Sequence, residues 1–323
     1  MRTLQKLLWT TVAAVPALMA AGPSFNCDFR DGVSPAPSTL YILCENATLL
    51  ASTDQGASWM SYSTGKERSL LAIAFLDAKR GLIAGDNGVL LASNDGGTHW
   101  QPLNANTSRA LRSISVVGES VWIAGDGGII LHSADGGRTW KAQASPITLG
   151  LEAIDFVDAQ HGWAVGWIGS ILRTTDGGAK WEQVKTDAAS WSLSSVTFRD
   201  LNHGWVVGFD GQILSTQDGG VTWQKQTSPS QSWLTSIRFD RSGRGWITTR
   251  EGFLSTTDGG KTWQAEAAPD GSFPNRLVDV NGAAWAIGSI GLLRRGDRDQ
   301  KWSVLGSLVP ASAGAPASGQ TGK

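Results

Sequence analysis

A short motif, Ser/Thr-x-Asp-x-Gly-x-x-Trp, recurs six times and constrains the fold more than any other feature of the sequence. The first copy runs from Ser52 to Trp59. A degenerate seventh copy between Arg295 and Trp302 keeps the aspartate and the tryptophan but lacks the glycine. Successive motif tryptophans lie 39 to 42 residues apart. A period of about 40 residues is typical of β-propeller blades, which bury their faces against one another. The motif aspartates are Asp54, Asp95, Asp135, Asp176, Asp218, Asp258 and Asp297.

A second pattern lies upstream of each motif and is clearest in residues 151–174. Three stretches, 151–156, 161–166 and 169–174, are rich in β-branched or alternating apolar residues and are bounded by Gly and Asp, which is typical of strands. A further strand beginning at the motif tryptophan gives four per unit, as in a propeller blade. We therefore predict an all-β, seven-bladed propeller with four-stranded antiparallel blades and Asp-box hairpins over residues 22–305. The approximate blades are 25–64, 69–105, 110–145, 151–187, 192–228, 233–268 and 274–305.

The two ends of the sequence differ from this repeat. Residues 1–21 combine a basic start, an apolar run and small residues at the exit, which predicts a secretory signal peptide. Residues 306–323 are rich in Gly, Ser, Ala and Pro and are predicted to be a disordered tail. We expect the mature protein to be exported and soluble, in the periplasm or an equivalent compartment such as the thylakoid lumen.

The sequence has two cysteines, Cys27 and Cys44. In an oxidising compartment they can form a disulfide, which is our prediction. The alternative is two buried thiols that act as small apolar side chains.

The charged residues are nearly balanced, with 27 Lys and Arg against 28 Asp and Glu. This balance gives no reason to expect nucleic acid or an anionic membrane as the main partner. We predict a monomer.

The repeated aspartate is predicted to have a structural role. In a tight hairpin its carboxylate can accept backbone N–H groups, while the glycine allows positive φ. The alternative, a metal or catalytic ring, is disfavoured because the copies lie far apart around the propeller and lack the spacing of a calcium loop. His161 and His203 both precede Gly-Trp, and this repetition favours a role in the turn over metal ligation. We predict no cofactor, metal site or catalytic residue.

The main alternative is a carbohydrate-active, sialidase-like hydrolase, because sialidases also carry Asp-boxes. Such an enzyme needs a tyrosine nucleophile, an acidic partner and an arginine cluster for the substrate carboxylate. The sequence has only Tyr41 and Tyr62, which fall in predicted strands, and it contains no Phe/Tyr-Arg-Ile-Pro segment. We therefore predict that the protein is not an enzyme.

Several large side chains outside the repeat map to one face of the propeller, where the turns after the second and fourth strands emerge. Trp and Arg are common anchors of protein interfaces, and an exposed apolar arc is typical of a binding surface. The alternative is that the rings cap the core or the channel mouth. The predicted protein-binding residues are Trp167, Trp191, Phe209, Trp233, Phe273, Arg68, Arg109 and Arg250.

The combined unit, best carried by residues 151–181 and 193–223, resembles the photosystem II stability/assembly factor family. These are exported seven-bladed propellers of chloroplasts and cyanobacteria that also occur in non-photosynthetic bacteria, and this sequence is similar to a bacterial member. The resemblance implies a non-enzymatic scaffold that assists the assembly or stability of a membrane or cell-envelope protein complex. It implies a photosystem II D1-like precursor as the client if the source is photosynthetic.

Overall fold

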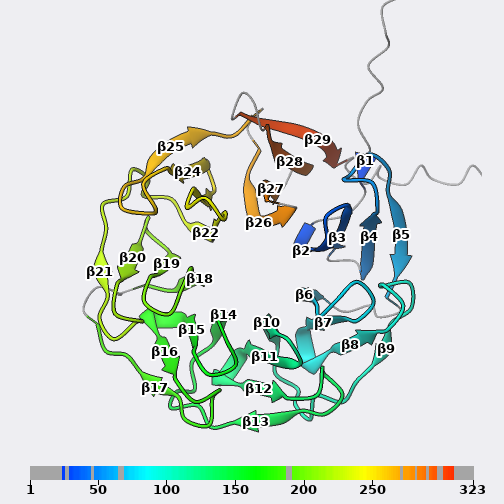
Figure 1. Ribbon diagram of the computed structural model, residues 1–323, viewed down its shortest axis with the longest axis horizontal. Coiled ribbons are helices and arrows are strands. Elements are labelled where there is room, and N and C mark those ends of the chain that lie inside the picture. The colour runs from blue at the N-terminus through cyan, green and yellow to red at the C-terminus, as the bar shows by residue number, and fades with distance from the viewer. Residues whose placement is uncertain are drawn as a thin grey trace, which may run out of the picture.

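The computed structural model shows a ring of blades around a central channel (Figure 1). It describes residues 24–25, 29–44, 47–64, 69–186, 191–269, 272–280, 282–288, 291–296 and 301–308. Each blade is a sheet whose strands run in sequence order from the channel to the rim. This confirms the predicted all-β, seven-bladed propeller with four-stranded antiparallel blades. In the described residues no helix has the length and apolar character needed to cross a bilayer.

The first four blades contain four strands each. Blade 1 contains β2 (Phe29–Ala36), β3 (Thr39–Cys44), β4 (Thr48–Ser52) and β5 (Met60–Ser63). Blade 2 contains β6 (Leu70–Phe75), β7 (Gly81–Gly85), β8 (Leu90–Ser93) and β9 (Gln101–Pro102). Blade 3 contains β10 (Leu111–Val117), β11 (Ser120–Gly125), β12 (Ile130–Ser133) and β13 (Lys141–Gln143). Blade 4 contains β14 (Leu151–Phe156), β15 (Gly162–Gly166), β16 (Ile171–Thr174) and β17 (Glu182–Gln183).

The remaining blades follow the same order. Blade 5 contains β18 (Leu193–Phe198), β19 (Gly204–Gly208), β20 (Ile213–Thr216) and β21 (Gln224–Lys225). Blade 6 contains β22 (Leu234–Phe239), β23 (Gly245–Thr249), β24 (Gly252–Thr256) and β25 (Gln264–Ala267). Blade 7 contains β26 (Pro274–Val280), β27 (Ala283–Gly288), β28 (Gly291–Arg295) and β29 (Trp302–Leu308). Single 3-10 turns, η1 (Asp86–Gly88), η2 (Asp126–Gly128) and η3 (Trp167–Gly169), follow the second strands of blades 2 to 4.

The ring closes where the N-terminal and C-terminal blades meet. A two-residue strand, β1 (Ser24–Phe25), adds parallel to the outer edge of β29 and makes blade 7 five-stranded. Ser307 and Leu308 pair with β1, so β29 runs three residues beyond the predicted end of the propeller at residue 305. The predicted signal peptide and the rest of the predicted tail lie outside the described residues. So does Cys27, and its link to Cys44, which is buried at the end of β3, remains a prediction.

Aromatic rings fill the wedge between neighbouring blades. In blades 3 to 5 the second-strand tryptophan faces a phenylalanine that ends the first strand of the next blade. Trp163 stacks on Phe198 with ring centroids 3.4 Å apart, and its Nε1–H donates to the Gly219 carbonyl across the interface at 3.0 Å. Trp122 makes the equivalent contacts with Phe156 and Gly177. The repeated tryptophans therefore join blades as well as filling them.

The innermost strands have one edge that faces the channel. In blades 2, 4, 5, 6 and 7, one or two N–H groups of the innermost strand donate to a polar side chain of the preceding blade, which satisfies backbone groups that would otherwise lack a partner. The Ser115 hydroxyl accepts from the Phe156 N–H at 3.0 Å, and the Asp155 carboxylate accepts from the Phe198 N–H at 2.8 Å. Burial raises the pKa of Asp155. These side chains line a channel cavity of about 270 Å³.

Candidate functional site at the channel mouth

The two faces of the propeller are built differently, and the Asp-box face is the regular one. In blade 3, the Asp135 carboxylate accepts from the backbone N–H groups of Arg138 and Thr139 at 3.0 and 2.9 Å. The Ser133 hydroxyl donates to Asp135 and accepts from the Gly137 N–H, whose φ of 87° suits glycine. Hydrogen bonds from Thr139 and Ser133 hold the pKa of Asp135 far below its ordinary value.

The other five described boxes share this arrangement. In each, the Ser or Thr hydroxyl donates to the aspartate, which accepts a backbone N–H four residues on. The seventh motif aspartate, Asp297, lies outside the described residues. The predicted turn histidines, His161 and His203, each place Nδ1 2.9 Å from an aspartate three residues earlier. Among the described residues no three His, Cys, Asp or Glu side chains lie close enough to hold a metal ion.

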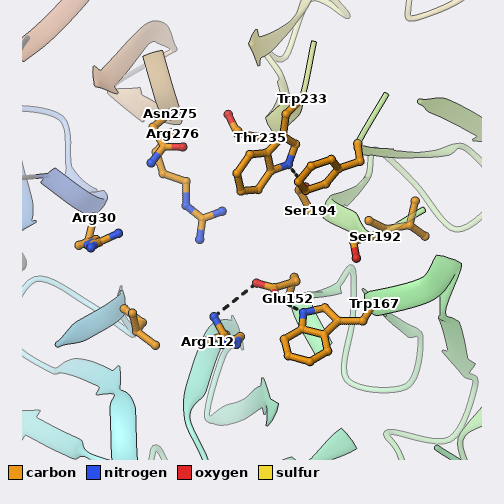
Figure 2. Close-up of a pocket in the computed structure, with 13 residues that line it drawn as sticks. Arg30, Arg112, Glu152, Trp167, Ser192, Ser194, Trp233, Thr235, Asn275 and Arg276 are labelled. Carbon is orange, nitrogen blue, oxygen red and sulfur yellow. Dashed lines mark hydrogen bonds and ion pairs between the residues drawn. The ribbon is translucent and has the colours of Figure 1, made fainter. Parts of the chain in front are cut away.

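The opposite face opens into a cavity of about 330 Å³ at the channel mouth, which we call the mouth cavity (Figure 2). It is built by a β-bulge at the start of every innermost strand. In blade 3, for example, Leu111 pairs with Gly125 and Ser113 with Ala124, so that Arg112 is the extra residue. A bulge re-aims a side chain out of the regular alternation. All seven bulge residues line the mouth cavity, namely Arg30, Leu71, Arg112, Glu152, Ser194, Thr235 and Asn275.

Three of the predicted binding residues form one wall of this cavity. Trp167, Phe209 and Trp233 come from blade 4, blade 5 and the entrance to blade 6. Phe209 stacks on Trp233 with ring centroids 4.5 Å apart, and the Trp233 Nε1–H donates to the Ser194 hydroxyl at 2.6 Å. The Trp167 Nε1–H donates to the Glu152 carboxylate at 2.5 Å. Both indole rings are therefore held in place by side chains of the cavity itself.

Four other predicted residues, Trp191, Phe273, Arg250 and Arg109, do not line the cavity. Trp191 and Phe273 are more than half exposed, at 57% and 55%. The Arg250 guanidinium lies over the Trp233 ring, 4.8 Å from its centroid, and the exposed Arg109 lies against the turn at Gly127. Arg68 lies outside the described residues. The structure thus brings Trp167, Phe209, Trp233 and Arg250 together and leaves Trp191 and Phe273 as exposed rings.

Sequence reasoning missed the cationic side of the cavity. Arg30, Arg112 and Arg276 come from blades 1, 3 and 7, and their side chains reach toward the same space in Figure 2. Arg112 Nε lies 2.6 Å from Asp126, and this pairing holds the pKa of the guanidinium above its ordinary value. For Arg30 and Arg112 the available signal was the position directly after the first residue of each innermost strand, because the repeat aligns these positions in a ring. Arg276 lies one position further along β26 and lacked this signal.

A family model gives the most direct relation to known proteins. The model for photosynthesis system II assembly factor YCF48 matches residues 51–149, 140–225 and 180–265. The protein belongs to this family. No curated protein sequence matches it.

Solved structures match most of the length of this protein. A structure of YCF48 bound to a D1 peptide is 20% identical, with a TM-score of 0.61, and the match covers 91% of this protein and 88% of that one. A streptogramin B lyase is 15% identical, with a TM-score of 0.69, over 82% of this protein and 92% of the lyase. The WD40 repeats of RRP9 are 10% identical, with a TM-score of 0.69, over 88% and 95%. At these identities the matches show the propeller fold alone. Proteins with different functions, enzymes among them, share this fold.

Proposed function

We propose that this protein is a non-catalytic binding scaffold that holds a segment of a membrane or cell-envelope protein during assembly, at the face around the mouth cavity. Family membership supports a role in assembly. The YCF48 structure with a D1 peptide supports a peptide-like segment as the ligand, and a D1-like precursor as the client if the source is photosynthetic. The proposal includes export of the protein as a monomer, in line with the predicted signal peptide.

The observation that carries the proposal is Ile168, in the turn after the second strand of blade 4. Its side chain is 70% exposed and its φ is 52°, a left-handed conformation that is costly for a β-branched residue. The same turn position holds Asn87, Gly127 and Asp210 in blades 2, 3 and 5, which adopt positive φ more readily. An exposed, strained and apolar residue stabilises neither the turn nor the core, so we attribute it to binding.

Neighbouring residues extend this exposed apolar surface. Trp167 precedes Ile168, and the Phe209 N–H donates to the carbonyl of Ser192, which follows Trp191. Capping of the core accounts for Trp233, which is half-buried, but it does not account for Ile168 or Trp191. Exposed aromatic rings gathered at the rim of a cavity are typical of protein interfaces.

The hydrolase alternative finds less support at this site. Glycoside hydrolysis uses two carboxyl groups that flank the scissile bond. Within the described lining of the mouth cavity, Glu152 is the one carboxylate, and it is engaged by Trp167 and Arg112. The arrangement favours binding over hydrolysis.

A capture experiment in the native cells tests the proposal. The double variant Ile168→Asn with Trp191→Ser removes two exposed side chains without opening the core. We expect it to capture less than a tenth of the membrane protein that crosslinks to the unmodified protein, as measured by quantitative mass spectrometry. The matched control is Leu201→Ser with Val221→Ser, since these side chains are 47% and 55% exposed on the Asp-box face. Equal capture by all three proteins would refute a binding role for this face.

A further inference from the structure

The mouth cavity has two chemically different halves. Blades 4 to 6 supply the aromatic wall of Trp167, Phe209 and Trp233, and blades 7, 1 and 3 supply Arg276, Arg30 and Arg112. Figure 2 shows Arg30, Arg112 and Arg276 on one side of this space and Trp167 and Trp233 on the other. A ligand that complements both halves carries an anionic group beside an apolar side chain.

The guanidinium of Arg276 has donors that the protein does not use. Arginine carries five N–H donors in a planar fork. The Arg276 side chain is 24% exposed, and its contact with an acid is through Nε, 3.4 Å from Asp31. Its two terminal nitrogens make no hydrogen bond to any residue that the structure describes, and they point into the mouth cavity. A planar carboxylate accepts two parallel N–H bonds from such a fork, and this geometry makes the pairing strong.

The hydrogen-bond donors of Arg112 are only partly used by neighbouring residues. Its Nε and Nη2 donate at 2.6 and 3.2 Å to Asp126, a residue that does not line the cavity. The remaining nitrogen, Nη1, lies 3.7 Å from Glu152, too far for a hydrogen bond. Glu152 in turn accepts from Trp167, so one carboxylate connects the cationic half of the cavity to the aromatic half (Figure 2).

We propose that the mouth cavity recognises a carboxylate next to an apolar side chain on the client, with Arg276 and Arg112 binding the carboxylate and Trp233 and Phe209 packing on the apolar group. Glu152 acts as a selectivity residue, because its charge partly occupies Arg112 and repels weakly bound anions. The carboxylate can come from the client's free C-terminus or from an Asp or Glu side chain. This inference rests on the proposed function and specifies the chemistry of its ligand.

Three synthetic peptides test the inference by calorimetric titration at low salt. The first ends in Gly-Ser-Leu-Phe with a free carboxylate, the second is the same peptide with a C-terminal amide, and the third is an amidated peptide with an internal Leu-Glu-Phe. We expect the neutral amide to bind at least tenfold more weakly than one or both of the anionic peptides, and the stronger of these identifies the source of the carboxylate. Equal affinity for all three peptides, or no binding by any at about 1 mM, would overturn the inference.

Variants then test the assigned residues. Arg276→Gln is expected to weaken binding of the preferred peptide at least tenfold, whereas Arg138→Gln, at an exposed arginine of the Asp-box face, leaves it unchanged. Glu152→Gln keeps an acceptor for Trp167 but removes the charge, so binding should become roughly two- to fivefold tighter. A gain of affinity cannot result from misfolding. Wild-type affinity in both Arg276→Gln and Glu152→Gln would refute the assignment.

The capture experiment separates this inference from the proposed function. If the Arg276→Gln variant still captures the client while Ile168→Asn with Trp191→Ser does not, the scaffold role stands and carboxylate recognition fails. If neither variant loses the client, both proposals fail.

Discussion

The two faces of this propeller carry the same number of turns per blade but follow different rules. On the Asp-box face, the six described boxes repeat one hydrogen-bonding pattern with Ser or Thr, Asp and Gly at fixed positions. On the mouth face, the residue at the bulge of the innermost strand changes from one blade to the next. The seven bulge residues are two arginines, a leucine, a glutamate, a serine, a threonine and an asparagine.

This difference separates folding from function within one molecule. A position that needs the same residue in every blade solves a problem that every blade has, such as satisfying a turn or filling the wedge between sheets. A position that differs in each blade has no shared folding requirement, so its residues are available for a ligand. The following predictions test this division.

The largest effect is expected in the repeated interior. Trp163→Ala removes a fully buried ring, its stack on Phe198 and its hydrogen bond to Gly219, and should lower the free energy of unfolding by about 3–5 kcal/mol. Trp205→Ala, at the equivalent position in blade 5, should cost a similar amount. Trp191→Ala on the mouth face should change it by less than about 0.5 kcal/mol. Chemical denaturation measures all three, and a cost for Trp191→Ala that matches the others would break the comparison.

A smaller effect of opposite sign is expected at the turn after the second strand. Ile168→Asn removes a β-branched residue from a left-handed conformation and should raise the free energy of unfolding by about 1 kcal/mol, while client binding falls. The reverse substitution in blade 2, Asn87→Ile, should lower stability by about the same amount. Both are measured by thermal or chemical unfolding. A loss of stability in Ile168→Asn would show that this side chain serves the fold.

The smallest effect is expected at acidic pH, in the contribution that an Asp-box carboxylate makes to the free energy of unfolding. Hydrogen bonds from the Ser58 side chain and backbone and from Ser52 lower the pKa of Asp54 to about 2, against an ordinary value of 3.8. A carboxyl whose pKa is lower in the folded state stabilises the fold above its ordinary pKa and loses this contribution as the pH falls toward 2. Asp54→Asn should therefore have a lower free energy of unfolding than the unmodified protein at pH 7, and this difference should disappear near pH 2. Unfolding curves across this range test it, and a constant difference would exclude the carboxylate charge as the cause.

The fold was predictable because its determinants repeat. A tryptophan every 39 to 42 residues, with Asp and Gly at constant offsets, predicts identical units, and identical units close into a ring. The aromatic wall was partly predictable, since Trp167 and Trp233 stood outside the repeat. Arg112 was missed because regular strand alternation places successive residues in the core or the channel, and the alternation fails at its bulge. Arg276 directly follows the bulge residue Asn275, and no repeated pattern marks it. The convergence of Arg112 and Arg276 depends on contacts between blades far apart in the sequence, which no local pattern encodes.

The pairing of β1 with β29 has a consequence for the order of folding. It joins Ser24 to Ser307, so it cannot form until nearly the whole propeller has been synthesised. The core at that junction is shared between the first and last blades, with Leu40 and Ile42 on one side and Val278 and Trp285 on the other. Contacts between such distant residues form late and slowly. The core between the first and last blades therefore stays unfilled on a nascent polypeptide until its last blade has been synthesised, and we expect ring closure to come late in folding.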